Sequence, residues 1–294
     1  MGIGSEDTSL RYVFFGTGEI ALGSLVQLVA SGLIPVAIVT APDRPKGREL
    51  IPTPSPVKRW AQDSGIDTLQ PERLDETLFE KLRALKAELF VLVDYGTFLP
   101  RTLLDISPHG TLNMHPSLLP RLRGPSPIRS AILTDEKKTG ISIMLVSAKM
   151  DEGPIVAQRV VSIANWPPRG RELDATLSEA GGMLLAHIIP LYVRGELETR
   201  EQNHDLATYS SIIKKEDGLL DLAHGDAYQN LLKIKAFDIW PGTYAFFERS
   251  GKKLRVQILD AHLDGNKLIV DMVKPEGKKE MLYTDFLRSG VVPL

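Results

Sequence analysis

The first fifty residues alternate apolar runs with small and polar residues in a pattern typical of strand, turn and helix. Residues 11–15 form a short apolar run that stops at Gly16-Thr-Gly18, and apolar residues then recur at helical spacing as far as Gly32. A second apolar run over residues 34–40 ends in a stretch rich in proline and glycine, residues 41–56. The pattern therefore predicts two strands joined by a helix and followed by a long loop.

The same alternation continues through the next 150 residues. Residues 89–93 are uniformly apolar, as expected for a strand that is covered on both faces. Further strands are predicted at residues 110–114, 141–146 and 155–163, and helices at residues 57–64, 75–86 and 172–193. Strands that alternate with helices in this way predict an α/β unit with a Rossmann-like, mostly parallel sheet.

The pattern changes after residue 196. Residues 198–205 are polar, and beyond residue 206 one helical pattern is followed by short β-like runs, with a turn at Asp264-Gly265-Asn266. The predicted runs are residues 244–247, 254–259 and 267–273. We therefore expect an α/β domain over residues 1–196, a linker over residues 197–205, and a small OB-like β-barrel domain over residues 206–294.

Composition narrows the classes of protein that fit. The 294 residues suit two domains, and 35 Lys and Arg against 37 Asp and Glu exclude a protein that binds nucleic acid through bulk positive charge alone. The absence of cysteine excludes disulfides, a thiolate nucleophile and an iron–sulfur cluster. Residues 1–10 lack the basic and apolar parts of a signal peptide, and no run of 18 apolar residues occurs. We expect a cytoplasmic protein without a membrane span.

The first strand-to-helix turn carries a possible nucleotide motif. The residues Gly16-Thr-Gly18-Glu-Ile-Ala21 fit the loose G-x-G-x-x-G/A pattern, with Asp43 downstream, and by themselves they suggest NAD binding. Small residues are also favoured at this turn in any doubly wound sheet for steric reasons. A nucleotide site and a merely tight turn both remain open on these residues.

A second candidate is more specific, because it combines an amide, an imidazole and a carboxylate. Asn113 and His115 lie two residues apart at a strand end, so their side chains point to the same side. Together they could stabilise an oxyanion and move a proton. Asp151, in a turn between two predicted strands, would favour the imidazolium if it lay against His115.

The same residues also allow interpretations without catalysis. His115 could be a hydrogen-bonded structural residue, and Asp151 could belong to an ordinary turn. Ser117 lacks the G-x-S-x-G elbow of a serine hydrolase, and the six histidines show no metal-ligand spacing. An amide, an imidazole and an acid without thiol or metal suit group transfer through a tetrahedral intermediate.

Motifs along nearly the whole chain resemble those of the 10-formyltetrahydrofolate-dependent formyltransferases, and within that group the family that formylates methionyl-tRNA. The shared motifs are Phe15-Gly-Thr17, Pro42-Asp-Arg-Pro45, Pro54-Ser-Pro-Val-Lys58, Tyr95-Gly96 with Leu99-Pro100, Asn113-x-His115-x-Ser-Leu-Leu-Pro120-x-x-Arg-Gly124, Met150-Asp-x-Gly-Pro154, Ala236-Phe237 with Trp240-Pro-Gly242, and Pro275-x-Gly-Lys-Lys279.

The resemblance implies roles for particular residues. Asn113, His115 and Asp151 would be the catalytic trio, and the donor would be 10-formyltetrahydrofolate without a metal. The residues implied in folate binding are Ser117, Leu118, Leu119 and Pro120, with Leu92, Tyr95 and Gly96 at the pterin pocket. The glycine motif at residues 16–21 would then be a remnant of Rossmann-like geometry that binds no dinucleotide.

The resemblance also implies initiator methionyl-tRNA as the partner of a monomeric enzyme. The basic residues predicted to contact it are Arg44, Lys46 and Arg48 in the loop after the second strand, and Lys252, Lys253 and Arg255 in the C-terminal part. Such charges can equally form a solvated surface. The loop at residues 47–52 has fewer glycines and lysines than the family usually has there, and the C-terminal part is shorter.

Several alternatives remain at this point. The same chemistry could serve another acceptor, either an amino sugar nucleotide or glycinamide ribonucleotide, or it could pass the formyl group to water as a hydrolase does. A non-catalytic RNA-binding protein could keep the fold without folate affinity. An NAD-linked dehydrogenase would instead use residues 16–21.

Overall fold

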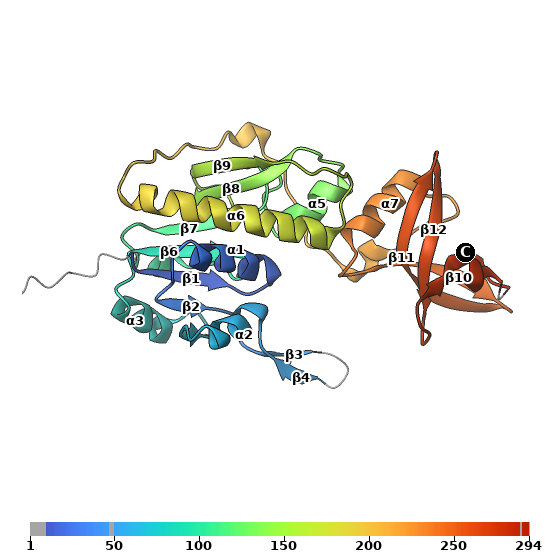
Figure 1. Ribbon diagram of the computed structural model, residues 1–294, viewed down its shortest axis with the longest axis horizontal. Helices are drawn as coiled ribbons and strands as arrows, with labels where there is room; N and C mark the ends of the chain where they lie inside the picture. The colour runs from blue at the N-terminus through green and yellow to red at the C-terminus, as the bar shows by residue number, and fades with distance from the viewer. Residues whose placement is uncertain (1–9, 47–49, 289, 294) are drawn as a thin grey trace, which may run out of the picture. The chain divides into compact units, whose positions relative to one another are not determined.

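The computed structural model describes residues 10–46, 50–288 and 290–293, and the chain divides into two compact units (Figure 1). The first unit comprises Met1–Arg123, Gly140–Val161 and Asp174–Thr208, and the second comprises Gly124–Thr139, Ser162–Leu173 and Tyr209–Leu294. The sequence placed one boundary between residues 196 and 206. In the structure, residues 197–205 group with the first unit instead of standing apart as a linker, and two earlier segments group with the second.

A seven-stranded sheet with the order β5-β2-β1-β6-β7-β8-β9 forms the centre of the first unit. Pairing is parallel from β5 to β7 and antiparallel between β7 and β8, so the sheet is mostly parallel and Rossmann-like, as predicted. The strands are β1 (Tyr12–Gly16), β2 (Ala37–Val39), β5 (Thr68–Leu69), β6 (Leu89–Val93), β7 (Thr111–His115), β8 (Thr139–Leu145) and β9 (Ile155–Val161).

Two helices, α1 (Glu19–Ala30) and α6 (Gly170–Val193), pack together on one face of this sheet (Figure 1). Their close approach requires small residues, since a Cβ on Gly182 would lie 2.6 Å from the carbonyl oxygen of Ser24. By length and composition alone, α6 could cross a membrane. Its residues Leu177 and Leu185 are nevertheless fully buried, so the apolar face of this helix contributes to the core.

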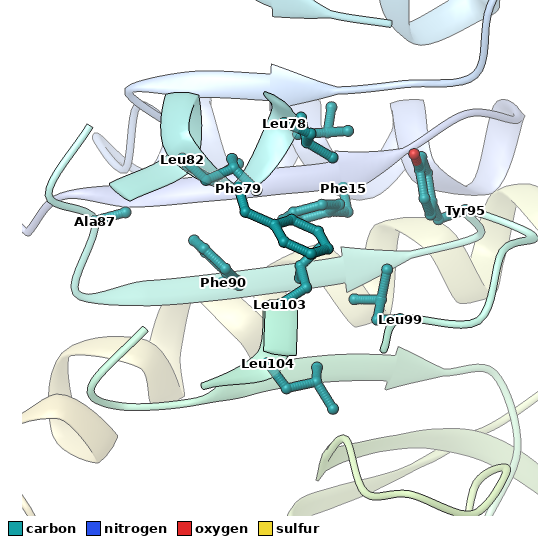
Figure 2. Packing of buried hydrophobic residues seen from close by; sticks show 12 residues of the cluster. Phe15, Leu78, Phe79, Leu82, Ala87, Phe90, Tyr95, Leu99, Leu103 and Leu104 are labelled. Carbon is teal, nitrogen blue, oxygen red and sulfur yellow. The ribbon is translucent and has the colours of Figure 1, made fainter. Parts of the chain in front are cut away.

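The opposite face of the sheet carries an aromatic core beneath α3 (Glu76–Ala84) and α4 (Arg101–Leu104), seen in Figure 2. Phe15 of β1 and Phe90 of β6 pack with ring centroids 5.3 Å apart. Helix α3 begins where the Asp75 side chain accepts a hydrogen bond from the backbone N–H of Leu78, and its Leu82 is fully buried. This core fixes the strand ends from which the candidate site is built.

A five-stranded antiparallel sheet with the order β13-β12-β11-β10-β14 forms the centre of the second unit, which confirms a small β domain. The helices and strands of this unit are α5 (Pro127–Leu133), α7 (Ala227–Ala236), β10 (Thr243–Arg249), β11 (Lys252–Asp264), β12 (Lys267–Pro275), β13 (Met281–Leu282), α8 (Tyr283–Leu287) and β14 (Val292–Pro293). Asp135 joins separate segments of this unit, because its carboxylate accepts hydrogen bonds from Trp166 Nε1 at 2.6 Å and from the Tyr228 hydroxyl at 2.8 Å.

The long loop predicted at residues 41–56 contains an unpredicted hairpin. Strands β3 (Arg44–Lys46) and β4 (Ile51–Thr53) pair antiparallel, and α2 (Pro56–Asp63) follows directly, capped by the Ser55 side chain. At the base of the hairpin, Asp43 accepts hydrogen bonds from Lys58 Nζ and Gln70 Nε2, each at 2.8 Å. These two donors hold the pKa of Asp43 below its usual value.

Candidate active site

Strand β7 presents Asn113 and His115 on one face of the sheet. Met114 between them contacts Gly181 of α6, so alternation directs Asn113 and His115 to the other face. Asn113 pairs with Leu92 of β6 and with Met144 of β8, near the carboxyl end of the parallel strands. Ligands of open α/β sheets bind at this edge. The imidazole of His115 is almost completely buried, and Asn113 is half-buried.

The two ring nitrogens of His115 have different partners. Nε2 lies 2.9 Å from the carbonyl oxygen of Leu122. Because a carbonyl oxygen only accepts, this nitrogen must carry a hydrogen. Leu122 is held in place by Thr208, whose side-chain oxygen accepts a hydrogen bond from the Leu122 N–H at 2.9 Å. The orientation of the imidazole ring is therefore fixed from the Nε2 side.

The other ring nitrogen faces the predicted carboxylate. Nδ1 of His115 lies 3.7 Å from Oδ2 of Asp151, so the turn between β8 and β9 places this carboxylate near the histidine. With Nδ1 bare, two lone-pair-bearing atoms would face each other, whereas a proton on Nδ1 makes an ion pair. The separation exceeds hydrogen-bond length, so Nδ1 and Oδ2 are not directly hydrogen-bonded to each other.

Asp151 adopts a backbone conformation that side chains other than glycine seldom take. Its φ is +54°, in the left-handed region. Two residues later, a Cβ on Gly153 would lie 1.8 Å from the Leu145 carbonyl oxygen, so only glycine fits there. The loop that carries the carboxylate is thus held in a specific and costly shape by its surroundings.

The residues Ser117 to Pro120, which the sequence assigned to folate, form the turn behind His115. The Ser117 hydroxyl is buried and donates to the Arg121 carbonyl oxygen at 2.6 Å. The buried Leu119 donates its N–H to Ser142 Oγ, and Leu118 is half-buried against Gly140. The Pro120 carbonyl oxygen accepts a hydrogen bond from the Thr208 N–H. These contacts shape the turn that delivers the Leu122 carbonyl to His115.

The segment assigned to the pterin pocket lies next to Asn113. Leu92 is the strand neighbour of Asn113, and Gly96 has φ +75° with no atom within 4 Å of a Cβ position, so space is open there. The Tyr95 ring packs edge-on against Phe15 with centroids 5.7 Å apart, in the core of Figure 2. Burial raises the pKa of Tyr95 to about 12, so its phenol stays neutral.

The glycine turn at residues 16–18 is filled from within the protein. The Asp94 carboxylate accepts a hydrogen bond from the Gly18 N–H at the start of α1, and a Cβ on Gly18 would lie 2.1 Å from Asp94 Oδ2. Although Asp94 keeps exposed surface, desolvation of its carboxylate, together with the nearby Asp174, raises its pKa to about 6. An acid at the helix N-terminus where a dinucleotide would place phosphate disfavours that ligand.

The basic residues predicted to contact RNA occupy two different surfaces. Arg44 is exposed on β3 and pairs with the equally exposed Glu72 at 3.1 Å. Lys46 ends β3, and Arg48 lies outside the described residues.

In the second unit, adjacent residues of β11 point in opposite directions. Arg255 and Lys253 stack over rings of β10, with 3.9 Å from Arg255 Cζ to the Tyr244 centroid and 4.0 Å from Lys253 Nζ to the Phe246 centroid. Lys252 pairs with Arg249 at the hairpin end and lies on the other side of the strand. The exposed face of β10 and β11 therefore combines aromatic rings with two cations.

Sequence reasoning missed two buried polar residues beside the trio. The fully buried Arg123 donates from Nε and Nη2 to Gln202 Oε1, at 3.1 and 2.8 Å. Gln202 lies in the stretch predicted as a linker and is itself buried. Arg123 stands three residues after Pro120 in the sequence, but only the fold shows that its side chain is buried.

Two cavities lie elsewhere in the molecule. A cavity of about 340 Å³ between β5 and α3 is lined by residues such as Gln70 and Lys81, and one of about 500 Å³ in the second unit is lined by residues such as Arg169 and Asp260. Neither includes His115 or Asp151, so the assignment of the site rests on side-chain geometry. Among the described residues, no cluster of three or more His, Asp or Glu side chains could hold a metal.

Comparisons with known proteins agree with this geometry. The family model for formyl transferase matches residues 10–187. The chain is 44% identical to the methionyl-tRNA formyltransferase of Chloroflexus aurantiacus over 84% of its length and 79% of that protein. It is 37% identical to the same enzyme of Herpetosiphon aurantiacus, with 96% of this chain and 98% of that protein covered.

Solved structures show the same fold at low identity. Methionyl-tRNA formyltransferase from Clostridium thermocellum superposes with a TM-score of 0.58 at 18% identity, covering 90% of this chain and 98% of that one. HypX from Aquifex aeolicus in complex with tetrahydrofolic acid gives a TM-score of 0.63 at 15% identity, covering 95% and 47%. From the matched residues and the identity along most of its length, the chain belongs to the methionyl-tRNA formyltransferase family of formyl transferases.

Proposed function

We propose that this protein transfers the formyl group of 10-formyltetrahydrofolate to the α-amino group of initiator methionyl-tRNA, in the cytoplasm and as a monomer. The single observation that carries the proposal is the convergence of His115 Nδ1 and Asp151 Oδ2, 3.7 Å apart, on the face of β7 that also presents Asn113. The similarity to family members along most of the chain supports the choice of acceptor.

His115 acts through Nδ1 in this proposal, because Nε2 is bound to the Leu122 carbonyl oxygen. As the neutral amine attacks the formyl carbon, negative charge develops on the formyl oxygen. The protonated Nδ1 and the Asn113 amide donate hydrogen bonds to that oxygen and stabilise the tetrahedral intermediate. Loss of one such donor typically lowers kcat on the order of 10²- to 10³-fold.

Asp151 acts in the same step. Its carboxylate faces Nδ1 of the imidazole across 3.7 Å, and it accepts the proton that the amine loses when the new C–N bond forms. That proton passes, through a water molecule, to N10 of the donor as the bond between N10 and the formyl carbon breaks. Atoms and charge balance without a covalent enzyme intermediate, which suits a site without a cysteine or a serine elbow.

In this proposal the donor lies beside Asn113, on the side of its strand neighbour Leu92 and of Gly96, where no atom lies within 4 Å of a Cβ position. In the proposal the turn Ser117–Pro120 contributes by shaping this pocket, since Ser117 and Leu119 are themselves tied to backbone groups and to Ser142. Tyr95 acts in the same way, as a core residue behind the pocket wall.

The experiment that tests the proposal follows the formyl carbon to its acceptor. Purified protein is incubated with 10-formyltetrahydrofolate labelled in the formyl group and with methionyl-tRNA, uncharged tRNA, an amino sugar nucleotide, glycinamide ribonucleotide or water alone. We expect label only on the α-amine of methionyl-tRNA. Label on another amine, or free formate as the main product, would reassign the acceptor.

We further propose that the five-stranded sheet, closed as a small OB-like barrel, contacts RNA through its exposed β10–β11 face. Aromatic rings can stack on bases, and the cations Lys253 and Arg255 that lie on those rings can pair with phosphate. Arg44 and Lys46 of β3, with Arg48 two residues after Lys46 in the sequence, would supply the second RNA contact from the first unit.

The register of β11 provides a matched comparison for this face. For the double variant Lys253→Ala/Arg255→Ala, the plot of log affinity for tRNA against log salt should become flatter by roughly 1.5, reflecting two lost phosphate contacts. Lys252→Ala changes a neighbouring residue on the other side of the strand and should leave the slope near its original value. An unchanged slope in the double variant would remove this face from the RNA contact.

A further inference from the structure

One buried glutamine connects the segment after α6 with the loop that carries Asp151. Gln202 is 5% exposed, and its Nε2 donates to the carbonyl oxygens of Asp151 at 2.8 Å and Gly153 at 2.7 Å. Both hydrogens of the amide are thereby used on one turn of the chain. Its Oε1 accepts the two hydrogen bonds from Arg123.

The orientation of this amide is fixed by its partners. A guanidinium only donates and a carbonyl oxygen only accepts, so the oxygen of Gln202 must face Arg123 and its nitrogen must face the loop. Arg123 is in turn enclosed, with Glu152 Oε1 at 3.6 Å and His204 Nδ1 at 2.9 Å. The hydrogen bonds from Arg123 through Gln202 to the loop are therefore compatible with only one orientation of the Gln202 amide.

The loop needs such a support. Asp151 has φ +54°, a conformation that costs an aspartate of the order of 1 kcal/mol and persists only where the surroundings hold it. Gln202 binds the carbonyl of Asp151 itself and the carbonyl two residues later, on both sides of Glu152. A loop held at both points keeps the Asp151 backbone in place, and with it the Cβ that carries the carboxylate toward Nδ1 of His115.

We propose that Gln202 is a positioning residue for the formyl transfer reaction, which acts by fixing Asp151 beside His115. The inference rests on the proposed function, because the benefit of a fixed carboxylate is expressed in catalysis. Gln202 touches neither the imidazole nor, in the mechanism above, the reacting atoms, so its effect passes entirely through the loop of Asp151.

The substitution Gln202→Glu distinguishes the two halves of the network, which are the hydrogen bonds accepted from Arg123 and the hydrogen bonds donated to the loop carbonyls. A carboxylate still accepts from Arg123, but it cannot donate to the carbonyls of Asp151 and Gly153. We expect kcat for methionyl-tRNA formylation to fall up to about 10²-fold, as for a catalytic group displaced by about 1 Å, with KM for methionyl-tRNA within about twofold of the wild-type value. Gln202→Leu, which loses both halves, should lower the thermal midpoint more than Gln202→Glu does.

A double-mutant cycle distinguishes positioning from a general loss of structure. If Gln202 acts only through Asp151, then Gln202→Glu should cause no further loss of kcat in an Asp151→Asn background. Multiplicative losses would overturn the proposal. Gln62→Glu makes the same chemical change at an exposed position of α2 and should leave kcat unchanged.

A second measurement does not depend on turnover. Amide hydrogen exchange of residues 150–155 should accelerate in Gln202→Glu and stay unchanged in Gln62→Glu. Equal protection of this loop in wild type and Gln202→Glu would refute the positioning role. Should the wild-type protein fail to formylate methionyl-tRNA, the proposed function falls, and the exchange experiment still decides whether Gln202 holds the loop.

Discussion

The buried guanidinium of Arg123 allows a prediction whose size follows from its contacts. Arg123→Met keeps the length and much of the volume of the side chain but removes every donor. The variant leaves Gln202 Oε1 without its two hydrogen bonds in a buried position, and it removes the cation that lies 3.6 Å from Glu152. Both losses should destabilise the first unit.

Most of the expected loss of stability comes from the unpaired Oε1 of Gln202. A buried acceptor that loses its partner costs about 1–3 kcal/mol. Glu152 retains 24% of its side-chain exposure and His204 retains 55%, so water can replace much of what Arg123 gave them. Relief from burying a charge offsets part of the loss. We expect Arg123→Met to lower the free energy of unfolding by about 1–3 kcal/mol.

Urea unfolding followed by circular dichroism measures this loss as a shift of the midpoint at constant slope. Arg101→Met is the matched control, because Arg101 is 78% exposed and pairs with Asp105 one helical turn away. Its loss should be below about 1 kcal/mol. Equal midpoints for Arg123→Met and Arg101→Met would refute the reasoning that the Arg123 network stabilises the unit.

Three further predictions concern other parts of the first unit. Because the pKa of Asp43 is lowered by Lys58, its contribution to stability is present above about pH 4 and lost on acidification. The thermal midpoints of wild type and Asp43→Asn should therefore differ at pH 7 and converge near pH 2. Gly153→Ala should lower kcat by on the order of 10²-fold, since its Cβ would displace the loop from Leu145. Leu82→Ala should cost about 2–5 kcal/mol in urea unfolding.

Hydrophobic periodicity was sufficient to predict most strands of the first sheet and the shared face of Asn113 and His115, two candidate site residues. The apolar run of residues 89–93 becomes β6 with the same bounds, and alternation put Asn113 and His115 on one face. Asp151 lies in a separate turn, and its approach to His115 depends on the pairing of strands that the local sequence does not specify. Its position in a turn made Asp151 one candidate for this place, the family resemblance pointed to the same residue, and the structure places its Oδ2 3.7 Å from Nδ1 of His115.

Buried polar residues were the main omission. Gln202 stands in a polar stretch without apolar periodicity, which looks the same in a sequence whether the side chains are solvated or enclosed. Its burial depends on Arg123, a residue 79 positions earlier in the chain. The hairpin of β3 and β4 was missed for a related reason, because two prolines interrupt strands of only three residues.

Basic residues that are close together in the sequence do not all lie on the same surface. Lys252, Lys253 and Arg255 form one cluster in the sequence, yet strand alternation separates Lys252 from the other two. The stacking of Lys253 and Arg255 on aromatic rings depends on the register between β10 and β11, which a turn of two residues sets.

The most direct test of the central claim is the single-turnover rate of formyl transfer to methionyl-tRNA by His115→Ala and Asn113→Ala, measured together with the affinity for the folate donor. We predict that each variant lowers the rate on the order of 10²- to 10³-fold while donor affinity stays near the wild-type value. Unchanged rates in both variants would contradict the assignment of the site.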